Sequence, residues 1–126
     1  MRSQIAVTGI IVSEPETAKV KRGSKEITKL SFRLMDKSNR TEAAEGPDWY
    51  MVECLGTLAE NSVTSLKKGD AVVVLGALTI TERIVEPPIG TSPFPLTTAL
   101  IAAKVIGHDL RAGTSEYSPN FTGHRG

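Results

Sequence analysis

The sequence has few of the residues that small proteins use for covalent stabilisation, metal binding and catalysis. It holds 1 cysteine and 2 histidines in 126 residues, which excludes an internal disulfide framework and leaves no Cys or His group at zinc spacing. It also lacks a phosphate-binding glycine loop, a signal peptide and an apolar run that could cross a membrane. We therefore expect a soluble, cytoplasmic protein that is not an enzyme and uses no metal or cofactor.

The one pair that could serve as nucleophile and base is Cys54 with His108. Cys54 lies on the same side of its predicted strand as Val52, and that side faces the core. Nothing in the sequence brings a histidine beside it. The pattern therefore favours a buried structural thiol over a reactive one.

Charge of one sign is not in excess overall, but the charges are segregated along the chain. The formal net charge is +1, yet residues 19–40 hold eight Lys or Arg against two acidic residues. The next twenty residues hold five acidic residues and no Lys or Arg. This distribution predicts two surfaces of opposite sign, one of which suits a polyanion.

The apolar periodicity predicts an all-β fold with one helix. Alternating patterns indicate strands over residues 4–12, 27–35, 49–55, 71–83 and 97–105, separated by a polar turn region at 17–26, a charged loop at 36–48 and a proline-rich projecting connection at 86–95. Ala59, Val63 and Leu66 recur at helical spacing between the third and fourth strands, with Lys67 in the last turn and Gly69 as a left-handed cap. Five strands with a helix in that place predict the Greek-key barrel of the OB-fold. We expect this domain to cover residues 1–111 and residues 112–126 to form a short, polar, disordered tail.

The segment from the third to the fourth strand carries a family resemblance. Its ordered elements are Trp49-Tyr50, Gly56, the motif LAEN at 58–61, the motif KKGD at 67–70, and Gly76 followed two residues later by Leu78. In this order the segment resembles the bacterial single-stranded DNA-binding proteins, and the end of the chain is most similar to their short-tailed second paralogues. The resemblance implies an OB-fold that binds single-stranded DNA with little sequence preference, in a homotetramer, and protects exposed strands in replication, recombination or repair.

The resemblance also assigns site residues. It identifies Trp49, at the start of the third strand, as a base-stacking residue, although a lone Trp in a small domain is more often a core or subunit-contact residue. In the second predicted strand Lys29 and Arg33 point away from the core. Together with Lys37 they would contact phosphates. The remaining candidates for DNA contact are Lys25, Arg40, Arg83 and Phe94, the last at an expected loop tip where it either stacks on a base or anchors the loop.

Departures from the family pattern favour a second hypothesis. Leu55 stands where the family has another stacking aromatic, and Arg83 replaces a further aromatic that is common near the end of the fourth strand. Aromatic residues make up only 5% of the chain. Glu53 shares the face of Trp49 and opposes a polyanion. The acidic, phenylalanine-ended tail tip of the family is missing, so tail-mediated recruitment of repair or replication proteins is not expected. The alternative function is an OB-fold adaptor that acts through protein contacts with weak or no DNA binding.

Overall fold

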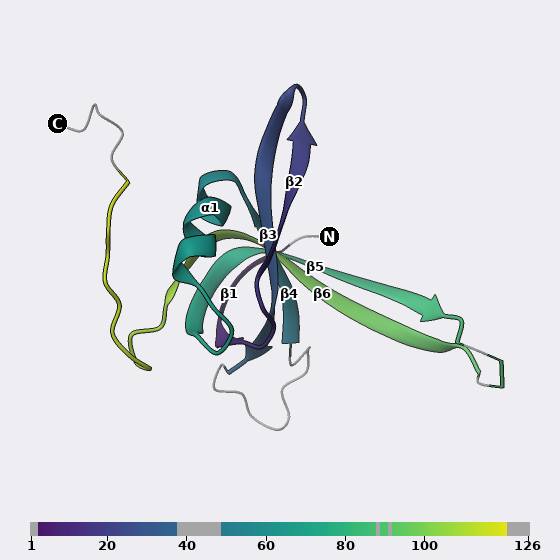
Figure 1. Cartoon of the computed structure of the whole chain (residues 1–126). Helices are drawn as coiled ribbons and strands as arrows, with labels where there is room; N and C mark the ends of the chain where they lie inside the picture. The colour runs from purple at the N-terminus through teal and green to yellow at the C-terminus, as the bar shows by residue number, and fades with distance from the viewer. Residues whose placement is uncertain (1–2, 38–48, 88, 91, 121–126) are drawn as a thin grey trace.

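The computed structural model describes residues 3–37, 49–87, 89–90 and 92–120, and these residues form six strands and one helix (Figure 1). The elements are β1 (Ser3–Ile11), β2 (Glu16–Arg22), β3 (Lys25–Asp36), β4 (Trp49–Leu55), α1 (Gly56–Ser65), β5 (Ala71–Val85) and β6 (Phe94–His108). The prediction of a mostly β fold with one helix before the strand at residue 71 is confirmed.

Five of the six strands close into a ring. The strand order is β1-β5-β6-β4-β3-β2, and β1 also pairs with β3, which closes the ring and leaves β2 outside it as an edge strand. β1 pairs with β5 over most of its length and with β3 only through Gly9, Ile10 and Ile11. The pairings are antiparallel except between β4 and β6, which run parallel. A closed five-stranded ring with a helix between β4 and β5 is the arrangement of the OB-fold.

The ring closes at a glycine. A Cβ atom at Gly9 would lie 2.3 Å from the backbone oxygen of Met35 and 2.9 Å from Cγ of Leu34. No side chain fits at that distance, because the contact is with backbone that is fixed by the β1–β3 pairing. The approach of β1 to β3 therefore depends on the absence of a side chain at this position.

The strand β2 is missing from the sequence prediction, which assigned residues 17–26 to a polar turn region. β2 pairs with β3 from Glu16 opposite Ser31 to Arg22 opposite Lys25, and all its side chains except that of Val20 are exposed. Because neither face of β2 is buried, its sequence shows no apolar alternation, and its pairing with β3 is what holds it as a strand. The strand count in the prediction is therefore one too low, although the five predicted strands are the five that form the ring.

The helix is shorter than predicted and faces the core with a different side. It ends at Ser65, with Leu66 as the C-cap, and has no acidic residue in its first turn and no basic residue in its last. The predicted macrodipole role of Lys67 is therefore wrong. Ser62 is buried and Val63 is exposed, because the buried positions follow spacings of three and then four residues, from Ala59 to Ser62 to Leu66. Gly69 does have a positive φ of 99°, but in the turn that leads into β5, not as the cap of α1.

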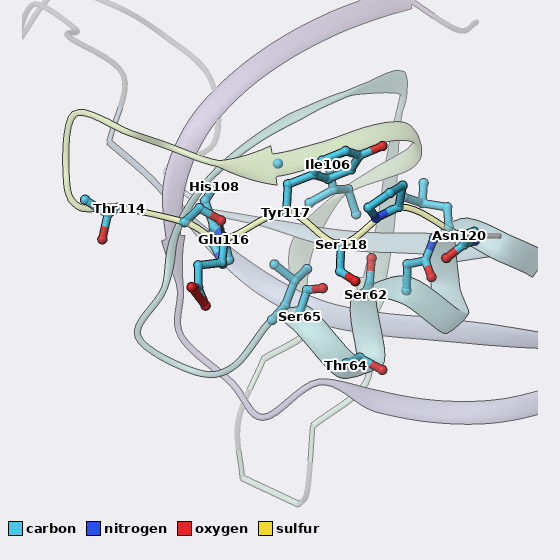
Figure 2. A pocket seen from close by; sticks show the side chains of 16 residues that line it. Ser62, Thr64, Ser65, Ile106, His108, Thr114, Glu116, Tyr117, Ser118 and Asn120 are labelled. Atoms are coloured by element: carbon cyan, nitrogen blue, oxygen red, sulfur yellow. Dashed lines mark hydrogen bonds between the residues drawn. The ribbon is translucent and has the colours of Figure 1, made fainter.

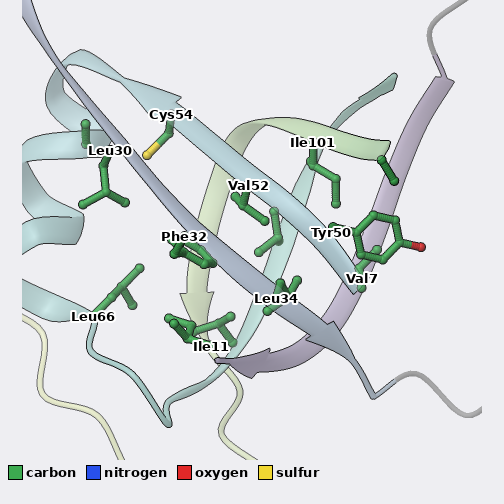
Figure 3. Close-up of a cluster of buried hydrophobic side chains, with 14 residues drawn as sticks. Val7, Ile11, Leu30, Phe32, Leu34, Tyr50, Val52, Cys54, Leu66 and Ile101 are labelled. Carbon is green, nitrogen blue, oxygen red and sulfur yellow. The ribbon is translucent and has the colours of Figure 1, made fainter. Parts of the chain in front are cut away.

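The core fills the inside of the ring (Figure 3). Each strand of the ring sends alternate residues inward, and the helix covers one opening through Ala59 with Leu66 beside it. The largest side chains that are fully buried are Phe32, Ile11, Leu30, Leu34, Ile101, Val52, Val72 and Val74. Among the described residues, no helix is long and apolar enough to cross a membrane.

Two hairpins project from the ring in different directions (Figure 1). One is β2 with the first half of β3. The other, called the β5–β6 arm below, consists of residues 81–85 of β5 paired with residues 94–98 of β6. The predicted projecting connection at 86–95 is thus only the end of a longer arm. Phe94 was expected at a loop tip, and that expectation is wrong because Phe94 is the first residue of β6 and pairs with Val85.

Candidate nucleic-acid interface

The candidate site lies on the outside of the ring, where the strands turn alternate side chains away from the core. In β4, Tyr50, Val52 and Cys54 are buried, whereas the residues between them are partly or fully exposed. The same alternation in β3 turns its odd-numbered residues outward. We call the outward side chains of the three adjacent strands β3, β4 and β6 the outer face; its members are Lys29, Ser31, Arg33, Trp49, Met51, Glu53, Leu55 and Leu100.

Trp49 and Arg33 form a contact at one end of the outer face. The indole of Trp49 is 37% exposed, and Cζ of Arg33 lies 5.4 Å from its ring centroid. Two hydrogen bonds fix the backbone of Arg33: its N–H donates to Oγ of Ser13 at 2.9 Å, and its carbonyl accepts from the N–H of Val12 at 2.9 Å. The contact is a cation–π interaction, so the indole of Trp49 already has a cation over one face.

Lys29 and Glu53 form an ion pair farther along the outer face, away from Trp49. Nζ of Lys29 lies 3.2 Å from Oε2 of Glu53, and both side chains are about one third exposed (34% and 33%). Because Lys29 is opposite Leu55 and Glu53 is opposite Ser31, the two charges are diagonal neighbours on adjacent strands. The two predicted phosphate contacts of the ring, Lys29 and Arg33, are thus both engaged with side chains of β4.

Two apolar residues complete this surface, and the sequence analysis did not single them out. Met51 is opposite Arg33 in β3 and is paired with Leu100 in β6, and both side chains are partly exposed. The signal was available for Leu100, since it lies between the buried residues Ala99 and Ile101 and must face the other way. Apolar area therefore adjoins the indole along the middle of the outer face.

Arg83 and Phe94 lie on the β5–β6 arm, with the same parity as the outer face. Leu96 and Phe94 lie an even number of positions before Leu100, so they face the same side of β6. Arg83 is opposite Leu96 and faces that side too. Phe94 is six residues from Leu100, which is about 20 Å along an extended strand. Both candidates are exposed, so the structure places them on an extension of the outer face and apart from Trp49.

The other predicted cations are spread over the molecule. Lys25 is the first residue of β3, opposite Arg22, at the end of the β2–β3 hairpin, and is exposed. Lys37 follows β3 and is exposed, and its N–H donates to the carbonyl of Thr8 at 2.9 Å. Arg40 lies outside the described residues. The structure thus brings Lys29, Arg33 and Trp49 together, and it does not bring Lys25 or Lys37 into that group.

A separate groove runs between α1 and the residues after β6 (Figure 2). It has a volume of about 1070 Å³ and is lined by α1, by the end of β6 and by residues 114–120. His108 anchors this segment: Nδ1 lies 2.8 Å from Oγ of Ser115 and Nε2 lies 3.2 Å from Oδ2 of Asp70. The groove shares no residue with the outer face.

His108 contacts Asp70 and Ser115, whereas Cys54 is buried in the core, where burial raises the pKa of its thiol and a hydrogen bond with Ser62 partly opposes the rise.

Two further observations bear on chemistry. Arg111 donates hydrogen bonds from Nε, Nη2 and its backbone N–H to the carboxylate of Asp109, which lowers the pKa of Asp109 and raises that of Arg111. This pair neutralises itself at the surface. In the part of the chain that the structure describes, no three His, Cys, Asp or Glu residues are placed to hold a metal ion.

Comparisons with known proteins agree on one family. The sequence model of the single-strand binding protein family matches residues 3–90. The chain is 28% identical to single-stranded DNA-binding protein 2 of two Tropheryma whipplei strains, over 94% of this chain and 76% of theirs. It is similar to the crystal structure of the small single-stranded DNA-binding protein of Streptomyces coelicolor, with a TM-score of 0.68 and 28% identity over 90% of this chain and 99% of that one. The fold also matches the second single-stranded DNA-binding protein of Mycobacterium smegmatis, with a TM-score of 0.62 and 23% identity over 94% of this chain and 98% of that one.

Proposed function

The chain belongs to the single-strand binding protein family, and from that premise we propose that it binds single-stranded DNA across the outer face of β3, β4 and β6. The observation that carries the proposal is the grouping of Trp49, Arg33 and Lys29 on one exposed surface. An unpaired strand offers base faces and phosphates, and a receptor for it needs an aromatic or apolar platform with cations beside it. Trp49 with Met51 and Leu100 supplies the platform, and Arg33 and Lys29 supply the cations.

Binding of this kind depends little on sequence, because stacking and phosphate contact read features that all bases share. We propose that the chain covers exposed strands during replication, recombination or repair, as a binding protein without catalytic activity, in the cytoplasm at the nucleoid. The names of its relatives state DNA binding only, so the processes are part of the proposal.

The test is a titration of the purified protein with oligothymidine, followed by the fluorescence of Trp49. Because Trp49 is the only tryptophan, quenching reports a base that stacks at this site. The proposal expects saturable quenching that weakens as salt rises, since phosphate contacts release counterions. Absence of binding at low salt would contradict it.

The second candidate function is an OB-fold adaptor that acts through protein contacts. The observation in its favour is that both ring cations are already engaged, Lys29 with Glu53 and Arg33 with Trp49. DNA must displace or share these partners, which lowers the gain from each phosphate contact. The same titration separates the two candidates, because an adaptor would give no salt-dependent quenching.

We further propose that the chain forms a homotetramer, and a patch on another part of the ring supports an assembly. Val73, Leu75 and Val105 are exposed on the outer side of β5 and β6, and Leu75 pairs with Ala6 of β1 on one side and with Val105 on the other. Exposed apolar patches of this kind mark protein contacts. Light scattering on a sizing column should show a tetramer, and Leu75→Glu should dissociate it. The matched control is Val63→Glu, which places the same charge at an exposed apolar position of α1. A monomeric parent would contradict the proposal.

A further inference from the structure

We propose that Glu53 reads bases: its carboxylate favours bases with an exocyclic amino group, such as cytosine, over thymine in the DNA that crosses the outer face. The inference rests on the proposed function, because it concerns the same surface. It adds a moderate base preference to binding that is otherwise tolerant of sequence.

Glu53 occupies a central place on the surface. It lies in β4, between Ser31 of β3 and Ala102 of β6, so it has a strand on each side. Its own strand places Met51 and Leu55 on either side of it along the outer face. Four residues separate it from Trp49, about 13 Å along the strand, so a base over Glu53 is a different base from the one that stacks on Trp49.

The carboxylate has acceptor capacity that the protein does not use. Oε2 accepts from Nζ of Lys29 at 3.2 Å, and this is the one polar contact that Glu53 makes among the described residues. An ionised carboxylate accepts about four hydrogen bonds through its two oxygens. Oε1 and the remaining lone pairs are therefore satisfied by water in the free protein, through the exposed third of the side chain.

A base that settles on this surface removes that water. A carboxylate that loses its water without gaining a donor is costly, and one that gains a donor in a drier site is bound more strongly than in water. Among the pyrimidines, cytosine presents the N4 amino group, which can donate to a carboxylate, whereas thymine presents the O4 acceptor in the same place. The single N3–H of thymine lies between two carbonyl oxygens, which repel a carboxylate.

The position of Lys29 strengthens the argument. If DNA draws Lys29 to a phosphate, Glu53 loses its one partner and depends on the base for a donor. If Lys29 stays at 3.2 Å from Oε2, Oε1 still needs a donor. In both arrangements a base with an amino group is favoured over thymine.

The experiment compares oligocytidine and oligothymidine of equal length, labelled with a fluorophore, by anisotropy at a pH where cytosine is neutral. The readout is the ratio of the two Kd values in each variant, so that intrinsic differences between the oligomers cancel. In Glu53→Gln the side chain keeps its size and gains an amide donor for thymine O4. We expect the preference for oligocytidine over oligothymidine to fall by about five- to tenfold relative to the parent, and Glu53→Ala should lower it too.

The matched control is Glu26→Gln, which removes an equal charge from an exposed position of β3 opposite Lys21, off the outer face. Its ratio should equal that of the parent. An equal gain of affinity for both oligomers in Glu53→Gln, with an unchanged ratio, would mean that Glu53 only repels phosphate; this overturns the base preference and leaves the proposed function standing. Failure of the parent to bind either oligomer would overturn the proposed function itself.

Discussion

Replacing Trp49 by alanine tests the candidate interface most directly, because Trp49 is the one aromatic residue among the members of the outer face. A base that stacks on an aromatic side chain contributes about 1–3 kcal/mol to binding. In the free protein, Arg33 lies 5.4 Å from the ring centroid, and a cation–π contact at an exposed site contributes about 0.5–1 kcal/mol. A base that takes the same side of the ring must displace this contact.

The net effect is therefore in the lower part of the stacking range. We expect Trp49→Ala to weaken the binding of oligothymidine by about 1–2 kcal/mol, or roughly 5- to 30-fold in Kd. Part of the loss is recovered because Arg33, no longer placed over the indole, can contact a phosphate. The salt dependence of binding should for this reason hold steady or steepen slightly.

The assay is anisotropy of labelled oligothymidine, since the variant has lost its tryptophan fluorescence. Trp49→Phe is the control, because it keeps a ring in the same place and should retain most of the affinity. A thermal melt of each variant excludes loss of folding, and the 37% exposure of Trp49 makes that loss small. If Trp49→Ala binds within about twofold of the parent, which is below the range for one stacked base, the residue is structural and the site lies elsewhere.

Three further predictions address charge, shape and core. Replacing Lys29 and Arg33 together by alanine should weaken binding to all sequences and flatten the slope of log K against log salt by about one to two phosphate contacts; an unchanged slope would move the phosphate contacts to the hairpins. Leu55→Phe adds a ring on the face of Trp49 and should tighten binding by up to about 1–3 kcal/mol with the salt slope unchanged, and the absence of any gain in a folded variant would show that DNA does not cross this end of β4. Phe32→Ala, at a position that is 2% exposed, should lower the free energy of unfolding in urea by about 3–5 kcal/mol, and a loss below 1 kcal/mol would contradict the assignment of Phe32 to the core.

The alternation of side chains in β3 and β4 could be predicted because the ring is buried on one side only. Where one face is core and the other is solvent, the sequence must alternate, so Leu30 and Val52 fix the outward direction of Lys29 and Trp49. This is why the residues of the outer face that lie in these two strands were predicted with the correct parity.

The hairpins could not be predicted in the same way, because both of their faces meet solvent. β2 has no apolar alternation, and Ile84 on the β5–β6 arm is exposed although its residue type suggests burial. In such segments the pairing partner decides the structure, and the partner is distant in sequence or absent from the local pattern. The helix shows the same limit: Val63 fits the helical spacing, yet Ser62 is the residue that faces the core.

The contacts of the outer face also decide where phosphates are held. Trp49 and Glu53 already occupy Arg33 and Lys29, so the ring offers DNA more apolar area than unengaged charge. The cations that make no ion pair among the described residues include Lys25 on the β2–β3 hairpin and Arg83 on the β5–β6 arm, the two hairpins that project from the ring. A strand of DNA that lies across the ring would thus stack on its middle and be held by phosphate contacts mainly toward the two hairpins. The slope of log K against log salt for the parent should therefore be larger than the part of it that is lost when Lys29 and Arg33 are replaced. The rest of the slope depends on cations of the hairpins, which the apolar alternation of the sequence does not reveal.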